Sequence, residues 1–216
     1  MDDKTAIADL FSLVPVAPTA RDEVIALMSA RDRHYHDINH LAQLWHHLLL
    51  YGIGRTVTEA PWQRLIASTI AFHDAIYDPT RRDNETRSAD LWRDASPVLE
   101  PWEVEWVAGT ILATADHLGA VPEPGMDPEA WAARLWVLDL DLSPLAATDG
   151  GFDANTAKLR AEYAHLDDAA WNAGRLGFLR TLSRWPLFFR TPVLAAAFEA
   201  KARANMAREL AGAEPS

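Results

Sequence analysis

Cysteine is absent from this chain of 216 residues. This absence excludes disulfides, thiolate metal sites and cysteine nucleophiles, and it fits a reducing compartment. Basic residues are also scarce, because 20 Lys and Arg stand against 31 Asp and Glu, a formal net charge of −11. That balance argues against nonspecific binding to nucleic acids or to anionic membranes, since both attract positive charge. An anionic substrate would need a local cation, such as a metal ion or an arginine cluster.

Long apolar runs are missing as well. Every apolar stretch is interrupted by charge, so we expect no membrane span. The first four residues do not resemble the start of a signal peptide, and we expect a cytoplasmic protein. Hydrophobic residues make up 49% of the chain and charged residues 24%, which is ordinary for a globular protein. The length is sufficient for one well-cored domain, and we expect residues 1–216 to form a single domain.

What the chain has in abundance is the helical period. Apolar residues recur three and four positions apart, prolines and glycines lie between the periodic segments, and no alternating β-branched run is present. We therefore predict an all-α fold, a single-domain compact bundle of about nine helices. Asp83 and Asp153 are candidate helix N-caps. The predicted helices are 20–31, 37–51, 59–76, 84–95, 100–118, 128–140, 153–165, 168–184 and 192–211.

Four short polar segments interrupt these apolar helices. They lie at residues 35–40 (YHDINH), 72–74 (FHD), 115–117 (ADH) and 138–141 (LDLD). Each brings histidine or aspartate to a stretch that otherwise has the composition of a core. Imidazole and carboxylate groups without cysteine are the donors that a hydrolytic metal site with nitrogen and oxygen ligands uses.

The first two segments carry the histidines of most interest. His36 and His40 are four residues apart, so on a helix they project from one face. They could share a metal, or one could bind it while the other donates a proton; a pair of half-buried histidines at a helix start is the alternative. His73 and Asp74 follow the apolar run 65–72, where burying an ionisable pair is costly unless it is paired or metal-bound. A helix-capping pair is the alternative there.

The last two segments are more ambiguous. His117 closes an apolar helix, a position that favourable interaction with the helix C-terminus also explains. Asp139 and Asp141 are two residues apart and rarely share a helical face, so we expect only one to point into a site. The remaining histidines are expected to be surface or packing residues; they are His34, His46, His47 and His165.

The ordered set His40, His73, Asp74 and a distal Asp141 resembles the HD-domain superfamily of metal-dependent phosphohydrolases. Residues 35–40 resemble a segment of the cyclic nucleotide phosphodiesterases of that superfamily, and residues 111–117 are similar to another. Residues 72–79, with the later Asn84-Glu85-x-x-Ser88-Ala89, resemble a bacterial group of predicted HD hydrolases. The resemblance covers about residues 33–145, and the helices of 150–211 are expected to pack on that region.

The resemblance also has departures. Position 37 is Asp where the phosphodiesterase segment has Asn. The glutamine that clamps purines in those enzymes has no counterpart here. Cyclic nucleotides are therefore not implied as substrates.

The resemblance implies a role for each of these residues. His40, His73, Asp74 and Asp141 would bind the metal, with Asp141 favoured over Asp139 as the distal ligand. His36 would protonate the leaving oxygen, and Asp74 would also orient the attacking water. Further candidates lie outside this set. His117, Glu85, Asp78 and Asp139 are outer-shell or second-metal candidates, and Arg81, Arg82 and Arg87 could attract phosphate. A helix-start role for Glu85 and solvated charges for the arginines are the alternatives.

The function expected from the resemblance is hydrolysis of a small-molecule phosphoester, with a nucleotide as the leading candidate, by a metal-activated water. The divalent metal could be Mn, Mg, Fe, Co, Ni or Zn. Two alternatives stay open: a catalytically idle HD domain that binds a nucleotide or metal as a sensor or partner module, and a di-iron HD oxygenase. The apolar stretch 185–189 is expected to be exposed, which leaves open a homodimer or a cover for the pocket.

Overall fold

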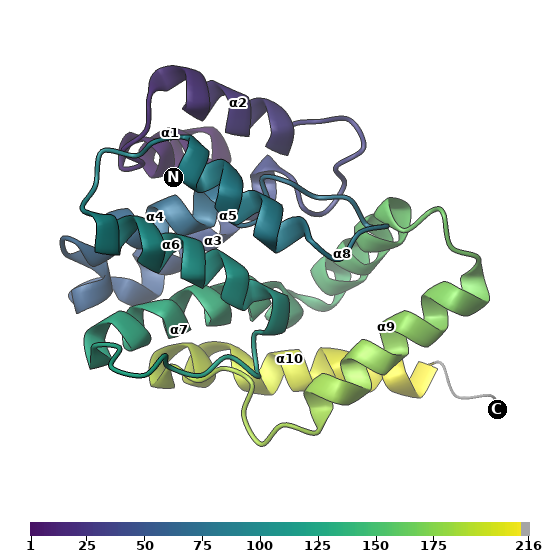
Figure 1. The fold of residues 1–216 in the computed structure, drawn as a ribbon. Coiled ribbons are helices and arrows are strands. Elements are labelled where there is room, and N and C mark those ends of the chain that lie inside the picture. The colour runs from purple at the N-terminus through teal and green to yellow at the C-terminus, as the bar shows by residue number, and fades with distance from the viewer. Residues whose placement is uncertain (213–216) are drawn as a thin grey trace. The chain divides into compact units, whose positions relative to one another are not determined.

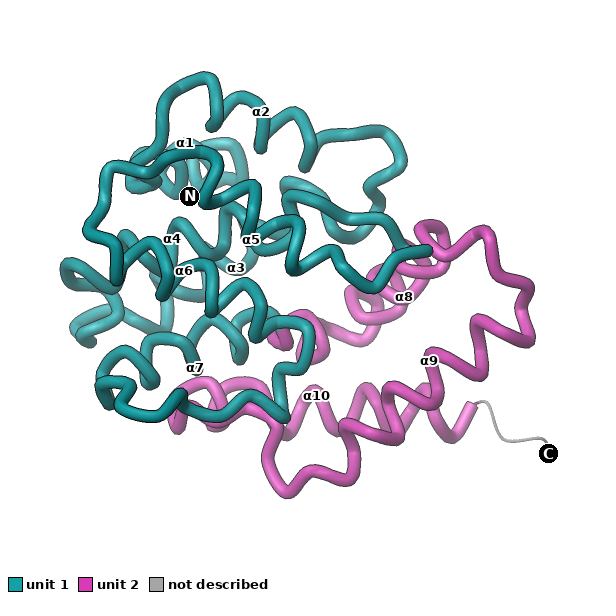
Figure 2. Tube along the Cα trace, in the orientation of Figure 1, with its two compact units in different colours: residues 1–141 teal, residues 142–216 magenta. Residues whose placement is uncertain are grey.

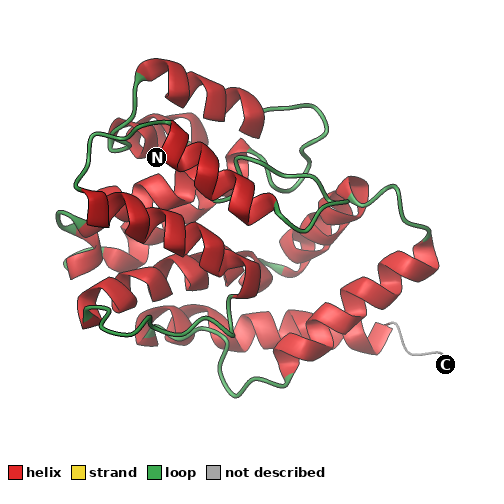
Figure 3. Ribbon diagram, viewed as in Figure 1, coloured by secondary structure: helices red, strands yellow, loops and turns green. Residues whose placement is uncertain are grey.

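The computed structural model of the protein describes residues 1–212, and these residues form helices and loops without a strand (Figure 3). This confirms the all-α prediction. The described residues contain ten α-helices, one more than expected. Figure 1 labels them: α1 (Asp3–Ser12), α2 (Pro18–Met28), α3 (Ile38–Gly52), α4 (Trp62–Phe72), α5 (Asn84–Asp94), α6 (Pro101–Ala113), α7 (Pro128–Leu142), α8 (Asp149–Glu162), α9 (Asp168–Ser183) and α10 (Pro192–Gly212).

The chain divides into two compact units, residues 1–141 and the residues from 142 onward (Figure 2). Three short 3-10 helices accompany the α-helices: η1 (Thr56–Thr58), η2 (Thr114–Asp116) and η3 (Ser143–Ala146). No described helix is both long enough and apolar enough to cross a membrane. The single domain expected over the whole chain stays a prediction.

The unexpected helix is α1. The Asp2 carboxylate caps it by accepting a hydrogen bond from the Thr5 amide at 2.8 Å. Its buried face packs against α3, where the Trp45 indole donates to the Asp9 carboxylate at 2.8 Å. Helix α1 is therefore held by a distant segment as well as by its own cap.

The N-cap predictions hold only in part, since Asp83 occupies the N-cap position of α5 without a side-chain cap and Asp153 is not an N-cap. Asp83 precedes α5, but its carboxylate makes no capping bond and instead accepts from the Arg81 guanidinium. Asp153 lies within α8, which begins earlier than expected and is capped by the Thr148 hydroxyl accepting from the Gly151 amide. At α5, Arg81 takes the carboxylate that was expected to cap the helix. At α8, Thr148 caps the helix in place of Asp153.

Helix α4 is the buried centre of the first unit. Residues 65–72 are all buried, and the helix packs against α1, α3, α5 and α6. A helix that is apolar on every side belongs in a core. It is shorter than the expected 59–76, because it ends at Phe72 with His73 as its C-cap. The polar pair His73-Asp74 therefore leaves the helix inside the unit.

In the second unit, α10 packs on η3 and α9. The Asn205 amide donates to the carbonyls of Leu145 and Ala147 at 2.9 and 2.8 Å. The expectation that residues 185–189 are exposed was only partly right. Trp185 and Leu187 are exposed, whereas Phe188 and Phe189 are buried. The Glu199 carboxylate explains this difference, because it accepts from both phenylalanine amides and so ties that part of the loop to α10.

Candidate metal centre

Three predicted ligands lie together inside the first unit. His40, His73 and Asp74 each offer one ligand atom, and these atoms all lie within 4.8 Å of one another. His40 comes from the first turn of α3, and His73 and Asp74 come from the end of α4. Both histidines are buried, at 4% and 2% exposure. Two helices that are distant in sequence therefore bring imidazole and carboxylate groups to one point.

Asp141 adds a second carboxylate from α7. Its Oδ1 lies 3.0 Å from His40 Nε2 and 3.5 Å from His73 Nε2. Asp139 is also buried and lies two residues earlier on the same helix. Asp141 is thus the distal aspartate whose carboxylate the structure brings to both predicted imidazole ligands.

His117 reaches the same group through Asp141. Its Nε2 lies 2.7 Å from Asp141 Oδ2, while the other oxygen of that carboxylate faces His40. His117 directly follows η2, where the predicted helix 100–118 has already ended as α6 at Ala113. The Asp141 carboxylate therefore links two imidazoles, one on each oxygen.

The hydrogen bonding of His73 shows what the group requires. His73 Nδ1 lies 3.0 Å from the Ile70 carbonyl, which can only accept, so Nδ1 carries a proton. In the neutral ring, Nε2 is then unprotonated, and its lone pair faces carboxylates. Asp74 Oδ2 lies 3.1 Å away and Asp141 Oδ1 3.5 Å away. A lone pair and two anionic oxygens at these distances need a positive charge among them.

A proton on His73 Nε2 supplies this charge but not a well-aligned hydrogen bond. Despite the short distances, no residue between 1 and 212 accepts a hydrogen bond of good geometry from that atom. A ring N–H points along one direction only, so it cannot be aligned with two carboxylates at once. A metal ion is larger and can contact several donors that do not lie on one line. The arrangement therefore suits a metal ion better than a proton.

The donor distances agree with this interpretation. Two ligand atoms about 2.0–2.2 Å from one ion and roughly 90–110° apart lie about 2.8–3.6 Å from each other. Three of the imidazole–carboxylate distances are 3.0, 3.1 and 3.5 Å, and the fourth, His40 to Asp74, is 3.9 Å. A ring whose second nitrogen donates to a carbonyl, as in His73, is typical of metal-binding histidines. His40 lacks such support, because no described residue bonds its buried Nδ1.

The pKa values of His73, Asp74 and Asp141 shift in the directions that favour a positive charge beside two carboxylates. Burial alone would lower the pKa of His73, but the carboxylates of Asp74 and Asp141 outweigh it and hold that pKa well above its usual value. Burial alone would raise the pKa of Asp74 and of Asp141. The nearby histidines together outweigh burial, His73 and His36 for Asp74 and His73, His117 and His40 for Asp141, so each pKa lies below its ordinary value. Without an ion, the cluster therefore holds a proton on His73 and keeps both aspartates ionised.

His36 lies beside this group in the segment before α3. Its ring stacks on Tyr77 with centroids 4.1 Å apart and lies 6.2 Å from the His40 ring. Its charge helps to lower the pKa of Asp74. His36 is therefore near the proposed ligands and is held by aromatic contacts.

The segment after the His73-Asp74 pair is held by α5. The Ser88 hydroxyl accepts from the Ile76 amide at 3.0 Å, and the Asn84 side-chain amide bonds both the amide and the carbonyl of Asp78 at 3.0 and 2.9 Å. These bonds give a structural role to two residues of the Asn84-Glu85-x-x-Ser88-Ala89 pattern. That pattern therefore fixes the backbone next to the centre.

Other predicted residues lie in the exposed loop and first turns around this segment. The Asp78 carboxylate accepts from the Thr80 amide and hydroxyl, and Arg81 Nε donates to Asp83 at 2.7 Å. Glu85 lies in the first turn of α5, in agreement with the helix-start alternative. Arg82 and Arg87 are exposed. The structure gives Asp78 and Arg81 local partners in their own loop.

Sequence reasoning missed Arg33 and Tyr77. Arg33 donates to backbone carbonyls on both sides of the centre, and its guanidinium lies 5.5 Å from the Tyr77 ring. An arginine that binds backbone leaves no periodic signal in the sequence. Its place two residues before the 35–40 segment is the only local clue.

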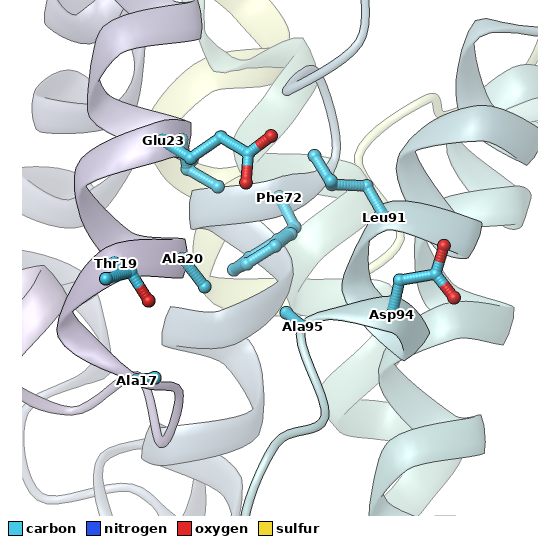
Figure 4. Close-up of a pocket in the computed structure, with 9 residues that line it drawn as sticks. Ala17, Thr19, Ala20, Glu23, Phe72, Leu91, Asp94 and Ala95 are labelled. Atoms are coloured by element: carbon cyan, nitrogen blue, oxygen red, sulfur yellow. The ribbon is translucent and has the colours of Figure 1, made fainter.

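A separate cavity of about 410 Å³ opens between α2, α4 and α5. In Figure 4, Phe72 lies between Ala20 and Ala95, with the carboxylates of Glu23 and Asp94 on either side. Its lining includes none of the predicted ligands, although Phe72 directly precedes His73. The cavity is thus distinct from the candidate metal centre.

Comparisons with models of known protein families, with curated proteins and with solved structures find no match for this chain. The function therefore has to be argued from the centre itself.

Proposed function

We propose that this protein is a metal-dependent phosphohydrolase that cleaves a phosphoester of a small molecule, with a nucleotide as the leading substrate class. The supporting observation is the buried group of His40, His73 and Asp74, with Asp141 beside it. Its donor distances and the unsatisfied His73 Nε2 suit a divalent ion. The order of these residues in the chain also resembles the HD-domain superfamily.

In this proposal, His40, His73, Asp74 and Asp141 hold the ion. A bound divalent ion lowers the pKa of a water ligand and neutralises charge on a phosphoryl oxygen. Asp74 accepts a hydrogen bond from the attacking water and orients it. His117 keeps Asp141 in place by donating to its second oxygen. A second-metal role for His117, Glu85, Asp78 or Asp139 is the alternative arrangement.

His36 supplies the proton. Hydrolysis forms a bond from the water oxygen to phosphorus and breaks the bond to the leaving oxygen. The leaving oxygen takes a proton from His36, which regains one from solvent. The stacked Tyr77 ring keeps the imidazole beside the ligands during this exchange.

The substrate phosphate would be attracted by the arginines of the 81–87 segment. Arg82 and Arg87 are exposed and can turn toward an anion, whereas Arg81 would have to exchange its bond with Asp83. The net charge of −11 makes such a local cationic group necessary for an anionic substrate.

The test combines metal analysis of the purified protein with a phosphate-release screen. Nucleotides and simple phosphoesters would be incubated with Mn²⁺, Mg²⁺, Co²⁺ and Ni²⁺. We expect one ion per chain and turnover that is lost in Asp74→Ala. Asp22→Asn, an exposed carboxylate on α2, is the matched control and should keep both metal and turnover.

Three results would count against this function. Tight nucleotide or metal binding without turnover would favour a sensor or partner-binding module. Two irons per chain without phosphate release would favour a di-iron oxygenase. Wild-type protein that binds none of these metals would end the metal interpretation as a whole.

A further inference from the structure

Arg33 joins the two segments that carry the proposed catalytic residues. Its Nη1 donates to the carbonyl of His36 at 3.0 Å and to the carbonyl of Asp74 at 2.7 Å. Its Nη2 donates to the carbonyl of Ala75 at 2.8 Å. The second and third acceptors lie 41 and 42 residues away in the sequence. One side chain therefore connects the segment before α3 to the segment after α4.

The two carbonyls that follow α4 need such a donor. Asp74 and Ala75 follow the end of α4, where carbonyls lack the amide partners that a continuing helix would supply. The guanidinium is planar and offers five N–H donors in a fixed fork, so it can serve several acceptors at once. A lysine ammonium carries the same charge but lacks this fork. The geometry therefore depends on arginine in particular.

Arg33 also contacts the aromatic ring that packs against His36. Its guanidinium lies 5.5 Å from the centroid of Tyr77, and the Tyr77 ring stacks on His36 at 4.1 Å. The backbone bond to His36 and this stack restrain the same residue in two ways. Loss of the fork would free the His36 backbone and loosen the stack together.

We propose that Arg33 is a positioning residue that fixes His36 against the backbone of Asp74 and Ala75. Its effect on turnover rests on the proposed function, because it acts through His36 as proton donor. Its effect on the structure does not, because the three carbonyl bonds exist whatever the reaction is. Two measurements separate these parts.

The first measurement compares two leaving groups in Arg33→Lys. p-Nitrophenyl phosphate releases a stable anion that needs no proton, whereas a nucleoside monophosphate releases an alkoxide that does. We expect about a 30-fold or greater loss of kcat on the nucleotide and less than about a 3-fold loss on p-nitrophenyl phosphate, within the range of general-acid catalysis. Arg31→Lys, an exposed arginine two residues earlier, should leave both rates unchanged.

A structural control tests whether loosening the same region is enough. Ser88→Ala removes the hydroxyl that bonds the Ile76 backbone but touches neither Arg33 nor His36. We expect it to lower stability and to affect the two leaving groups equally. Equal losses in Arg33→Lys would overturn the proposal, and so would a leaving-group dependence in Ser88→Ala.

The second measurement needs no activity. In protein labelled with ¹⁵N-histidine, Arg33→Lys should shift and broaden the His36 ring signals, and Arg31→Lys should leave them unchanged. Unaltered His36 signals in Arg33→Lys would overturn the positioning role. If wild-type protein cleaves no phosphoester but the His36 signals respond, the proposed function fails and Arg33 remains the residue that places His36.

Discussion

Each unit of the protein buries an ionic group, and the two groups differ in how their hydrogen bonds are completed. In the second unit, Arg175 donates from Nε and Nη2 to the two oxygens of Glu209, both at 3.0 Å, and Nη2 also donates to Thr156 at 3.1 Å. In the first unit, His73 Nε2 faces the carboxylates of Asp74 and Asp141 without a hydrogen bond of good geometry to any described residue.

The completeness of the hydrogen bonds separates structural buried charges from functional ones. The Arg175–Glu209 pair matches opposite charges in a bidentate arrangement, so it needs nothing from outside the chain. The His73 group collects imidazole nitrogens and anionic oxygens at one point, and the ring proton that balances their charge makes no hydrogen bond of good geometry. A buried charge that completes its own bonds supports the fold, whereas one left incomplete indicates a ligand.

The largest expected effect is on metal affinity. His73→Gln should weaken Mn²⁺ binding by about 100-fold or more, because a proposed direct ligand is lost and even an outer-shell partner commonly contributes 10–100-fold. Titration calorimetry would measure it, with Arg175→Gln and the exposed His165→Gln as comparisons. If Arg175→Gln weakened Mn²⁺ binding as strongly as His73→Gln, the distinction between the two groups would fail.

The next effect is on stability. Arg175→Met should lower the free energy of unfolding by about 3 kcal/mol, because it leaves Glu209 partly buried without its partner. Urea denaturation followed by circular dichroism would measure the loss. Adding Glu209→Leu to the variant should recover much of it, since no charge then stays buried. A double variant as unstable as the single one would contradict the view of a self-contained pair.

Release of a proton from His73 on Mn²⁺ binding is a further test of the difference between the two buried groups. The pKa of His73 is raised well above its ordinary value when no ion is bound, so the ring is protonated at neutral pH. A metal ligand must be deprotonated, and Mn²⁺ binding near pH 7 should therefore release about one proton per chain. Calorimetry in buffers of different ionisation enthalpy counts it. Binding without proton release would show that His73 is neutral before the ion arrives.

The smallest effect concerns acid sensitivity away from both groups. Burial, with a further contribution from neighbouring His46, lowers the pKa of His47 to about 4. The unfolded chain therefore binds a proton that the folded chain does not, so His47 supports stability fully above its ordinary pKa of 6.5. That contribution is lost as the pH falls from 6.5 toward 4.

Replacing His47 tests this. The urea midpoint of His47→Gln should decline less between pH 6.5 and 4 than that of the wild type, with His165→Gln as the control. Parallel declines in all three proteins would assign the acid sensitivity to other groups, the metal-centre carboxylates among them.

Local signals explain what could be predicted from the sequence. The periodicity of 65–72 is strong because the helix is buried on every side, and the polar pair after it stands out for the same reason. Helix α1 escaped prediction because part of its support is the Asp9–Trp45 bond to the distant α3. The failed Asp83 cap has a similar cause, since nearby Arg81 takes its carboxylate.

The candidate site also contains residues that could be predicted from the sequence and one that could not. The residue types and order of His40, His73, Asp74 and Asp141 are visible in the sequence, and the structure brings these four together. Arg33 is not visible, because it binds carbonyls that every residue has. Side chains that recognise chemistry leave a pattern in the sequence; a side chain that recognises backbone leaves none.

The backbone-directed bonds of Arg33, Asn84 and Ser88 carry a consequence for how this protein can change. All three hold main-chain atoms of residues 74–78, or of His36, and none contacts a side chain there through these bonds. Residue 76, which is half-buried, can therefore be exchanged while the scaffold of the centre keeps its shape, whereas Ala75 is fully buried and its size is fixed by the core. Such a design lets the surroundings of the ligands diversify, and with them the molecules that fit, at little risk to the ligands themselves.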